Sequence, residues 1–181
     1  MTDAAPPKVP TLGERIERLE SRFAIQDLAA RYSVAVDSKD IDSLVRLYVE
    51  DFVITPDQVG RDAVRARFHG LLKTFGRSIH LIVGQTVDFA SAEHALGTVY
   101  CRAEAERPDG WAVSMIGYFD RYERRDREWL IAARQVRTFY ERPLSPPPLE
   151  RFGMSSDPSE RDAHLPYHWP SFGAFPESLE G

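Results

Sequence analysis

The sequence predicts an α+β fold in which three N-terminal helices pack against a strongly curved antiparallel sheet. Apolar residues recur every three or four positions up to about residue 75, which is the period of an amphipathic helix. After Gly76 the pattern changes to long runs rich in Val, Ile, Tyr, Phe and Trp, which are typical of strands. Only a few residues separate these runs, so neighbouring strands are expected to be antiparallel. A sheet that curls around a helix leaves a cone-shaped hollow between them.

The first helix is expected over residues 12–36 and a second, short helix over residues 44–48. The apolar face of the first helix comprises Leu12, Ile16, Leu19, Phe23, Ile25, Leu28, Tyr32 and Val36. Glu and Arg are expected on its outer face, with a kink or break near Ser21. Asp40 or Asp42 can cap the second helix, because an aspartate side chain accepts hydrogen bonds from the free amides of a first turn.

A short strand is expected over residues 52–55 and a third helix after Gly60. The strand ends before Pro56, which cannot donate to a β-ladder. The apolar face of the third helix comprises Val64, Phe68, Leu71 and Phe75.

Four longer strands are expected over residues 79–90, 94–106, 111–125 and 128–142. Asp109-Gly110 and residues 125–127 suit tight hairpin turns. A straight run of about 15 residues would span roughly 50 Å at ~3.3 Å per residue, so these strands must bend around a small domain. Gly97 and Gly117 lie within strands, where we expect bulges or bends.

Composition indicates one globular domain. The chain has 181 residues and a net charge of -5 at pH 7, and it lacks a basic stripe, so nucleic-acid binding is not expected. We expect a disordered arm over residues 1–10, a domain over 11–142, and a tail rich in proline and aromatic residues over 143–181. Neither a membrane span nor a signal peptide is expected. The single cysteine, Cys101, fits a reducing cytoplasm.

Two residues on separate elements suggest an acid–base site. Asp37 lies at the expected end of the first helix, and His80 lies at the start of the first long strand. The helix macrodipole disfavours a carboxylate at a C-terminus, so Asp37 is expected to have a cationic partner. A carboxylate that holds an imidazole in one tautomer makes a general base near neutral pH. We therefore predict a His80–Asp37 dyad inside an apolar pocket.

Residues 24–51 and 117–141 resemble the opening helix pair and the closing hairpin of a known family. This is the SnoaL-like group of the nuclear-transport-factor-2-like superfamily, whose members are cone-shaped α+β barrels. Within the group, the chain is similar to three kinds of cofactor-free lyase: bile-acid 7α-dehydratases, scytalone dehydratases and hexachlorocyclohexane dehydrochlorinases. The resemblance covers about residues 12–142, and it implies the catalytic aspartate and histidine at Asp37 and His80.

The same resemblance implies roles for three more residues. Tyr32 matches a pocket tyrosine five residues before the aspartate, and Arg137 matches an arginine on the last strand. Gln135 stands where the bile-acid enzymes have a further tyrosine, which leaves the substrate open. Tyr32 and Asp37 differ by about 140° on an ideal helix, so both can face the cavity only if the helix ends or distorts between them.

The predicted function is a cofactor-independent, dehydratase-type elimination on a hydrophobic, ring-containing small molecule of steroid, terpenoid or polyketide size. His80 would remove a proton from carbon, and Asp37 would stabilise the imidazolium. Tyr32 would donate to the leaving hydroxyl, and Arg137 would position the substrate. The expected substrate-binding residues are Val99, Cys101, Met115, Gln135 and Phe139. No metal-ligand set or cofactor motif is found in the sequence, so neither group is expected.

Two other functions remain open. A ketosteroid-isomerase-like proton shuttle would use Tyr32 and a carboxylate near residue 56, but Pro56 occupies that place and Asp57 lies one residue away. A non-catalytic small-molecule binder, like the β subunit of aromatic-ring dioxygenases, would share the fold without the chemistry.

A homo-oligomer, either a trimer or a dimer, is also expected. Tyr118, Tyr122 and Tyr140 would supply interface area if they point outward. The tail, with Tyr167, Trp169 and Phe172, is expected to close a pocket mouth.

Overall fold

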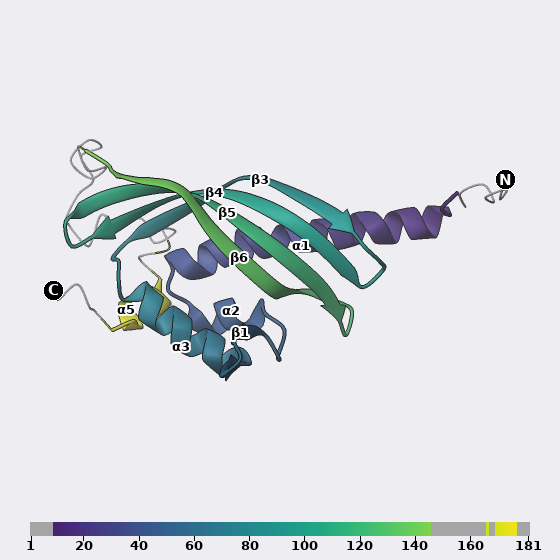
Figure 1. Ribbon diagram of the computed structural model, residues 1–181, viewed down its shortest axis with the longest axis horizontal. Helices are drawn as coiled ribbons and strands as arrows, with labels where there is room; N and C mark the ends of the chain where they lie inside the picture. Colours follow the sequence, from purple (N-terminus) through teal and green to yellow (C-terminus); the bar gives the residue numbers. More distant parts are fainter. Residues whose placement is uncertain (1–8, 146–165, 167–168, 177–181) are drawn as a thin grey trace.

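The central element is a four-stranded antiparallel meander that curves over the helices (Figure 1). The structure is a computed structural model that describes residues 9–145, 166 and 169–176. The strands are β3 (Ser78–Phe89), β4 (His94–Arg107), β5 (Gly110–Arg125) and β6 (Glu128–Pro143), paired in the order β3-β4-β5-β6. The predicted α+β class and antiparallel sheet are therefore confirmed.

The helices lie on the concave side of the sheet. They are α1 (Leu12–Asp37), α2 (Ile41–Arg46), α3 (Arg61–Leu72) and the short α5 (Pro170–Ala174). A capping box between Thr11 and Glu14 starts α1, which is continuous through Ser21, so the predicted break there is wrong. Asp40 caps α2 by accepting from the Ser43 amide at 3.0 Å. A small hairpin of β1 (Val53–Thr55) and β2 (Gln58–Val59) joins α2 to α3.

The two halves of α1 have different surroundings. From Ile25 onward the residues of the predicted apolar face are buried, whereas its earlier members are exposed, namely Leu12, Ile16, Leu19 and Phe23. Only the first turns of this half project beyond the sheet (Figure 1). Its side facing the sheet carries cations instead, with Arg18 and Arg22 stacked 5.1 and 5.8 Å from the Phe89 ring. The expected arrangement, with arginines outside and apolar residues inside, is therefore wrong for this half.

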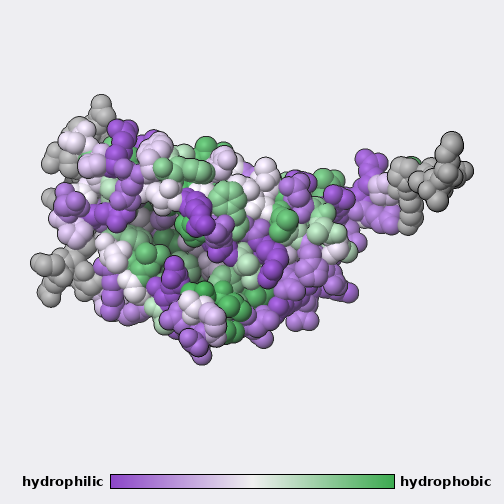
Figure 2. Space-filling model, viewed as in Figure 1, coloured by the Kyte–Doolittle hydropathy of each residue, from purple (hydrophilic) through white to green (hydrophobic). Residues whose placement is uncertain are grey.

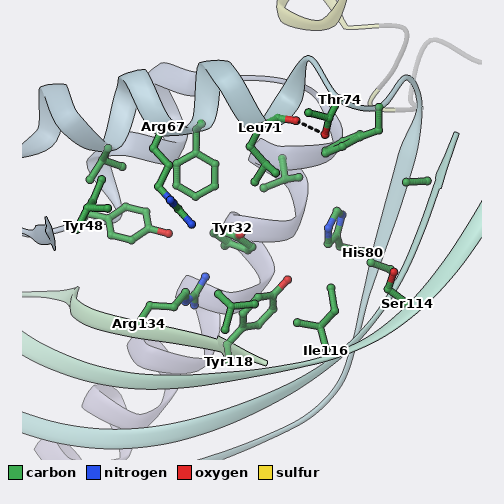
Figure 3. A pocket seen from close by; sticks show the side chains of 18 of the residues that line it. Tyr32, Tyr48, Arg67, Leu71, Thr74, His80, Ser114, Ile116, Tyr118 and Arg134 are labelled. Carbon is green, nitrogen blue, oxygen red and sulfur yellow. Dashed lines mark hydrogen bonds between the residues drawn. The ribbon is translucent and has the colours of Figure 1, made fainter. Parts of the chain in front are cut away.

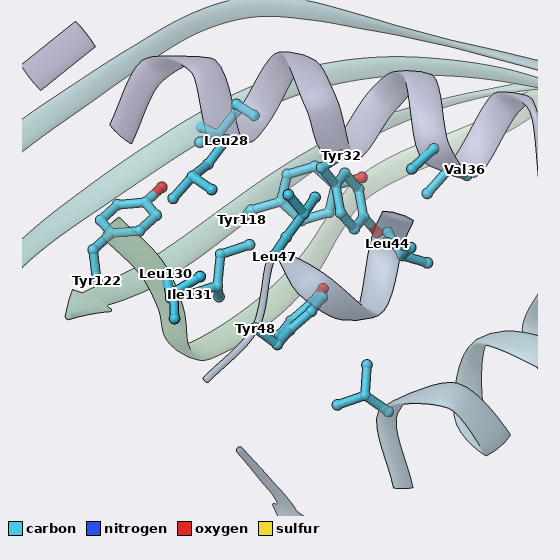
Figure 4. Packing of buried hydrophobic residues seen from close by; sticks show 14 of the residues in the cluster. Leu28, Tyr32, Val36, Leu44, Leu47, Tyr48, Tyr118, Tyr122, Leu130 and Ile131 are labelled. Carbon is cyan, nitrogen blue, oxygen red and sulfur yellow. The ribbon is translucent and has the colours of Figure 1, made fainter. Parts of the chain in front are cut away.

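The hydrophobic core lies between α1, α2 and the concave face of the sheet (Figure 4). It includes Leu28, Leu44, Leu47, Tyr122 and Ile131, all almost fully buried. Burying each aliphatic side chain contributes about 1.5–3 kcal/mol. The segment after α2 also pairs with β6 through the Ile131 amide and the Leu47 carbonyl at 2.8 Å.

The tyrosines expected at an interface divide between the two faces of the sheet. Tyr118 and Tyr122 are buried and point toward α1, as Figure 4 shows, whereas Tyr140 is exposed. Only Tyr140 of the three can therefore contribute to an outer surface.

Three bulges bend the sheet, and none is at a glycine. Pairing skips one residue at Val83 in β3 and at Ala132 and Phe139 in β6. Because side chains alternate along a strand, each extra residue exchanges the inner and outer faces beyond it. No bulge lies at Gly97, whereas the bulge at Phe139 lies beside Gly117, where a Cβ would be 3.2 Å from the Phe139 ring. Gly97 serves close packing instead, since a Cβ there would lie 2.8 Å from the Tyr122 ring.

The described part of the tail packs against the ends of α1 and α3. Ser171 donates to the Ser38 carbonyl at 2.8 Å, and Phe175 is buried. Lys39 lies 4.9 Å from the ring centres of both Phe172 and Phe175, and it donates to two carbonyls at the end of α3. Tyr167, from the predicted mouth-closing set, is outside the described residues. Within those residues, no helix is long and apolar enough to cross a membrane.

Candidate active site

A cavity of about 490 Å³ lies between the sheet and the helices. Its walls come from α1, the β1 hairpin, α3 and all four strands of the main sheet. Figure 2 shows hydrophobic side chains gathered between the sheet and α3, where the surface is hollowed. Apolar walls with a few polar side chains are typical of sites that bind small molecules. The polar groups in this cavity therefore decide what it can do.

Asp37 and His80 form the predicted pair. The Nδ1 atom of His80 lies 2.6 Å from Oδ1 of Asp37, and their side chains are only 10% and 6% exposed. An ionised carboxylate can only accept hydrogen bonds, so Nδ1 carries the proton in this pair and Nε2 is left as the acceptor. His80 lines the cavity (Figure 3), so the geometry suits a general base.

Two further hydrogen bonds fix the carboxylate of Asp37. The Ser78 hydroxyl donates to Oδ1 at 2.7 Å, and the His80 amide donates to Oδ2 at 2.8 Å. Asp37 is the last residue of α1, so these bonds tie the end of the helix to the start of β3. They offset the unfavourable position of a carboxylate at a helix C-terminus.

Tyr32 lines the same cavity and lies five residues, about 1.4 turns, before Asp37. The Tyr32 ring packs edge-on against Tyr118, with 5.5 Å between ring centres. Burial raises the pKa of Tyr32 above its ordinary value, although Arg134 opposes this shift. Its hydroxyl therefore keeps its proton at neutral pH and can donate a hydrogen bond.

Arg134 is the buried cation of the site, and the sequence analysis did not select it. Its Nε and Nη2 atoms each donate to a different oxygen of Asp120 at 2.7 Å. The guanidinium also lies 4.4 Å from the ring centre of Tyr32 and 4.5 Å from that of Tyr118. Its third nitrogen, Nη1, is buried and has no hydrogen-bond partner among the described residues.

Arg137, the arginine expected in the cavity, is exposed and does not line it. The bulge at Ala132 explains the difference. Tyr122 and Asp120 point inward on β5, and their partners on β6 are Ile131 and Arg134 respectively. The inward residues of β6 therefore have odd numbers before the bulge and even numbers after it. Without the extra residue, Gln135 and Arg137 would face inward.

The residues expected to bind substrate do not line this cavity either. Gln135 and Phe139 are exposed on the outer side of β6, and Met115 pairs with the outward Arg102. Val99 and Cys101 face inward but are fully buried beneath the wall. Burial raises the pKa of the Cys101 thiol to about 11, so it remains protonated at neutral pH. The wall is formed instead by residues such as Val36, Phe68, Ala103, Ile116 and Val136.

Asp57, the carboxylate that an isomerase-like shuttle would need, is exposed and is not part of the cavity wall. The neighbouring wall positions are Ile54 and Thr55, and neither can act as a carboxylate base. The geometry thus favours His80 as the base.

Comparisons with known proteins agree with this fold. Residues 17–135 match the SnoaL-like domain. A γ-hexachlorocyclohexane dehydrochlorinase of Sphingobium indicum is 28% identical over 137 residues, covering 72% of this chain and 88% of that enzyme. The crystal structure of LinA superposes with a TM-score of 0.67 at 26% identity, covering 73% of this chain and 95% of the other.

A further crystal structure, from Novosphingobium aromaticivorans, is of a protein proposed to be a scytalone dehydratase. It superposes with a TM-score of 0.64 at 24% identity, covering 72% of this chain and 91% of that one. At this identity the likeness shows the fold alone.

Proposed function

Because the chain belongs to the SnoaL-like domain family, we propose that it is a cofactor-independent lyase acting on a hydrophobic ring compound. One observation carries the proposal: the 2.6 Å contact between His80 and Asp37, with the imidazole at the wall of a largely apolar cavity. Such a pair can remove a proton from carbon without a cofactor. The similarity to a dehydrochlorinase supports an elimination, because that name denotes loss of hydrogen chloride.

In the proposed reaction, Nε2 of His80 takes a proton from a ring carbon. The electrons of the broken C–H bond form a carbon–carbon double bond, and the bond to the leaving group on the adjacent carbon breaks. The carboxylate of Asp37 stabilises the imidazolium that forms, which then returns its proton to the departing group or to water. The leaving group is a hydroxyl in a dehydratase and a chloride in a dehydrochlorinase.

Tyr32 and Arg134 form the polar wall of the same cavity. The protonated Tyr32 hydroxyl would donate to a leaving hydroxyl or to a developing negative charge. Arg134 takes the positioning role that the sequence analysis gave to Arg137, because it is the arginine whose guanidinium contacts Tyr32. Both groups are buried, which strengthens their interactions with a polar substrate atom.

The test begins with a panel of hydroxylated and chlorinated ring compounds, scored by mass spectrometry for loss of water or hydrogen chloride. We expect His80→Ala and Asp37→Asn each to lower turnover by about 10²–10⁴-fold, the usual contribution of positioned acid–base catalysis. Circular dichroism should show an unchanged fold.

His94→Ala is the matched control, because His94 is exposed at the start of β4 and does not line the cavity. It should retain full activity. Full activity in His80→Ala would exclude the dyad as the base.

A further inference from the structure

The charges around the cavity are unbalanced. Three arginines line it, namely Arg67, Arg107 and Arg134, and no Asp or Glu among the described residues does so. Arg107 pairs with Glu141 at 2.6 Å and Arg134 pairs with Asp120 at 2.7 Å, in both cases with carboxylates outside the wall. Arg67 forms no ion pair or hydrogen bond with the other described residues. It is therefore the cavity cation that lacks a counter-charge in that part of the chain.

The position of Arg67 on α3 is unusual for a surface arginine. It lies on the side of the helix that lines the cavity, beside Val64 and Phe68. The other arginines at the start of α3 have acidic neighbours: Arg61 lies 3.5 Å from Glu50, and Arg65 lies 2.6 Å from Asp42. Arg67 lacks such a partner among the described residues, and a bound anion would supply one.

Arg67 and Arg134 approach the cavity from opposite walls. Figure 3 shows both guanidinium groups pointing into it, Arg67 from α3 and Arg134 from β6, while His80 lies toward the other end. Asp120 occupies Nε and Nη2 of Arg134, but Nη1 is buried without a partner among the described residues. Asp120 balances the charge of Arg134, so the uncompensated charge facing the cavity is that of Arg67, while Nη1 of Arg134 remains a buried donor without an acceptor among the described residues.

We propose that Arg67 and Nη1 of Arg134 together bind a carboxylate on the substrate, which is therefore a ring-containing organic acid. The inference rests on the proposed function only for the reaction that follows binding. A carboxylate has two oxygens and can accept from both guanidinium groups at once. Anchored there, the acid would leave its ring system in the apolar part of the cavity, toward His80.

The test measures binding rather than turnover. The probes are aryl carboxylic acids of one to three rings, beginning with benzoic, 2-naphthoic and 9-anthroic acid, each paired with its carboxamide. The amide keeps the shape of the acid but carries no charge. We expect wild-type protein to bind at least one acid about tenfold more tightly than its amide by isothermal titration calorimetry. Added salt should reduce that preference, because Arg67 is exposed to solvent.

Arg67→Gln should abolish the preference for the acid, and Arg67→Lys should keep most of it. Arg65→Gln is the matched control, because it removes the same charge from the same helix outside the cavity. It should bind like wild type. Equal binding of acid and amide by wild type across the panel, or an unchanged preference in Arg67→Gln, would overturn the inference.

His80→Ala separates this inference from the proposed function. It should keep the acid preference, because His80 is not one of the two anchoring cations, even though it loses turnover. A loss of preference in His80→Ala would also count against the proposed anchor. Retained turnover in the same variant would remove only the lyase mechanism.

Discussion

Asp120 is the carboxylate on which the buried Arg134 depends. The two side chains are 0% and 5% exposed, and Asp120 also accepts from the Tyr122 hydroxyl at 2.8 Å. Removing one partner of a buried ion pair leaves an uncompensated charge, which costs about 3–5 kcal/mol. We therefore expect Asp120→Ala to lower the free energy of unfolding by that amount in urea denaturation.

Two further variants serve as controls for this prediction. Asp42→Ala breaks the exposed pair with Arg65 and should cost less than about 1 kcal/mol. The double variant Asp120→Ala/Arg134→Met should be more stable than Asp120→Ala alone, because it also removes the orphaned charge. A small loss in Asp120→Ala, equal to that of Asp42→Ala, would contradict the prediction.

Individual residues of the site were predictable to different degrees. Asp37 and His80 could be placed together because they lie at a helix end and at a strand start, whereas Tyr32 was selected through the family resemblance. Arg134 was missed because the direction of a side chain on β6 depends on a bulge that local sequence does not mark. Arg67 was missed because an arginine within an amphipathic helix normally indicates the solvent face.

Gly97 controls the packing between β4 and the Tyr122 side chain at the scale of the sheet. A Cβ at this position would lie 2.7 Å from the Thr86 carbonyl oxygen and 2.8 Å from the Tyr122 ring. The carbonyl belongs to the neighbouring strand and cannot move without breaking the ladder. We expect Gly97→Ala to destabilise the protein by about 1–3 kcal/mol, the usual cost of overpacking, in thermal and urea unfolding.

Gly84→Ala is the comparison for this prediction. No atom lies within 4 Å of the Cβ that it would add, although the residue is in the adjacent strand. Its effect should be within about 0.5 kcal/mol of wild type. Equal losses in the two variants would show that strand glycines matter here for a reason other than close contact.

The elements themselves were largely predictable. The four long strands begin and end within a residue or two of the positions expected from β-type runs and short turns. Asp40, one of the two expected caps, starts the second helix at Ile41, but the helix ends at Arg46 and not at Tyr48. The bulges were not predictable, because they arise from how long strands align with their partners rather than from glycine.

The exposed first half of α1 is relevant to the oligomeric state of the protein. Leu12, Ile16, Leu19 and Phe23 follow spacings of four, three and four positions, which is the repeat of a coiled-coil seam. All four are exposed, and the opposite side of the helix faces the sheet through Arg18 and Arg22. A second copy of the chain presents the same seam, so pairing of two such helices would cover it.

We therefore expect the protein to self-associate through this part of α1, in keeping with the predicted homo-oligomer. Leu19→Glu should lower the mass measured by sedimentation equilibrium, because it places a charge within the seam. Glu20→Gln, at the adjacent position, should leave the mass unchanged. A wild-type protein that sediments as a monomer at tens of micromolar would contradict this expectation.

The fold class of the whole molecule could be predicted because periodicity and turn length are local properties. The arrangement of α1 could not, because an apolar stripe shows that a helix face needs covering but not what covers it. The same limit applies to the cavity. Its existence follows from a curved sheet over a helix, whereas its lining depends on strand register.

The bulge at Ala132 has a consequence for how the cavity could change during evolution. One inserted or deleted amino acid upstream of Arg134 would exchange the inward and outward faces of the following part of β6. The side chains that now point outward would then replace Arg134 and Val136 in the cavity wall. Related proteins could thus acquire a different ligand preference through a change in strand length, without several point substitutions.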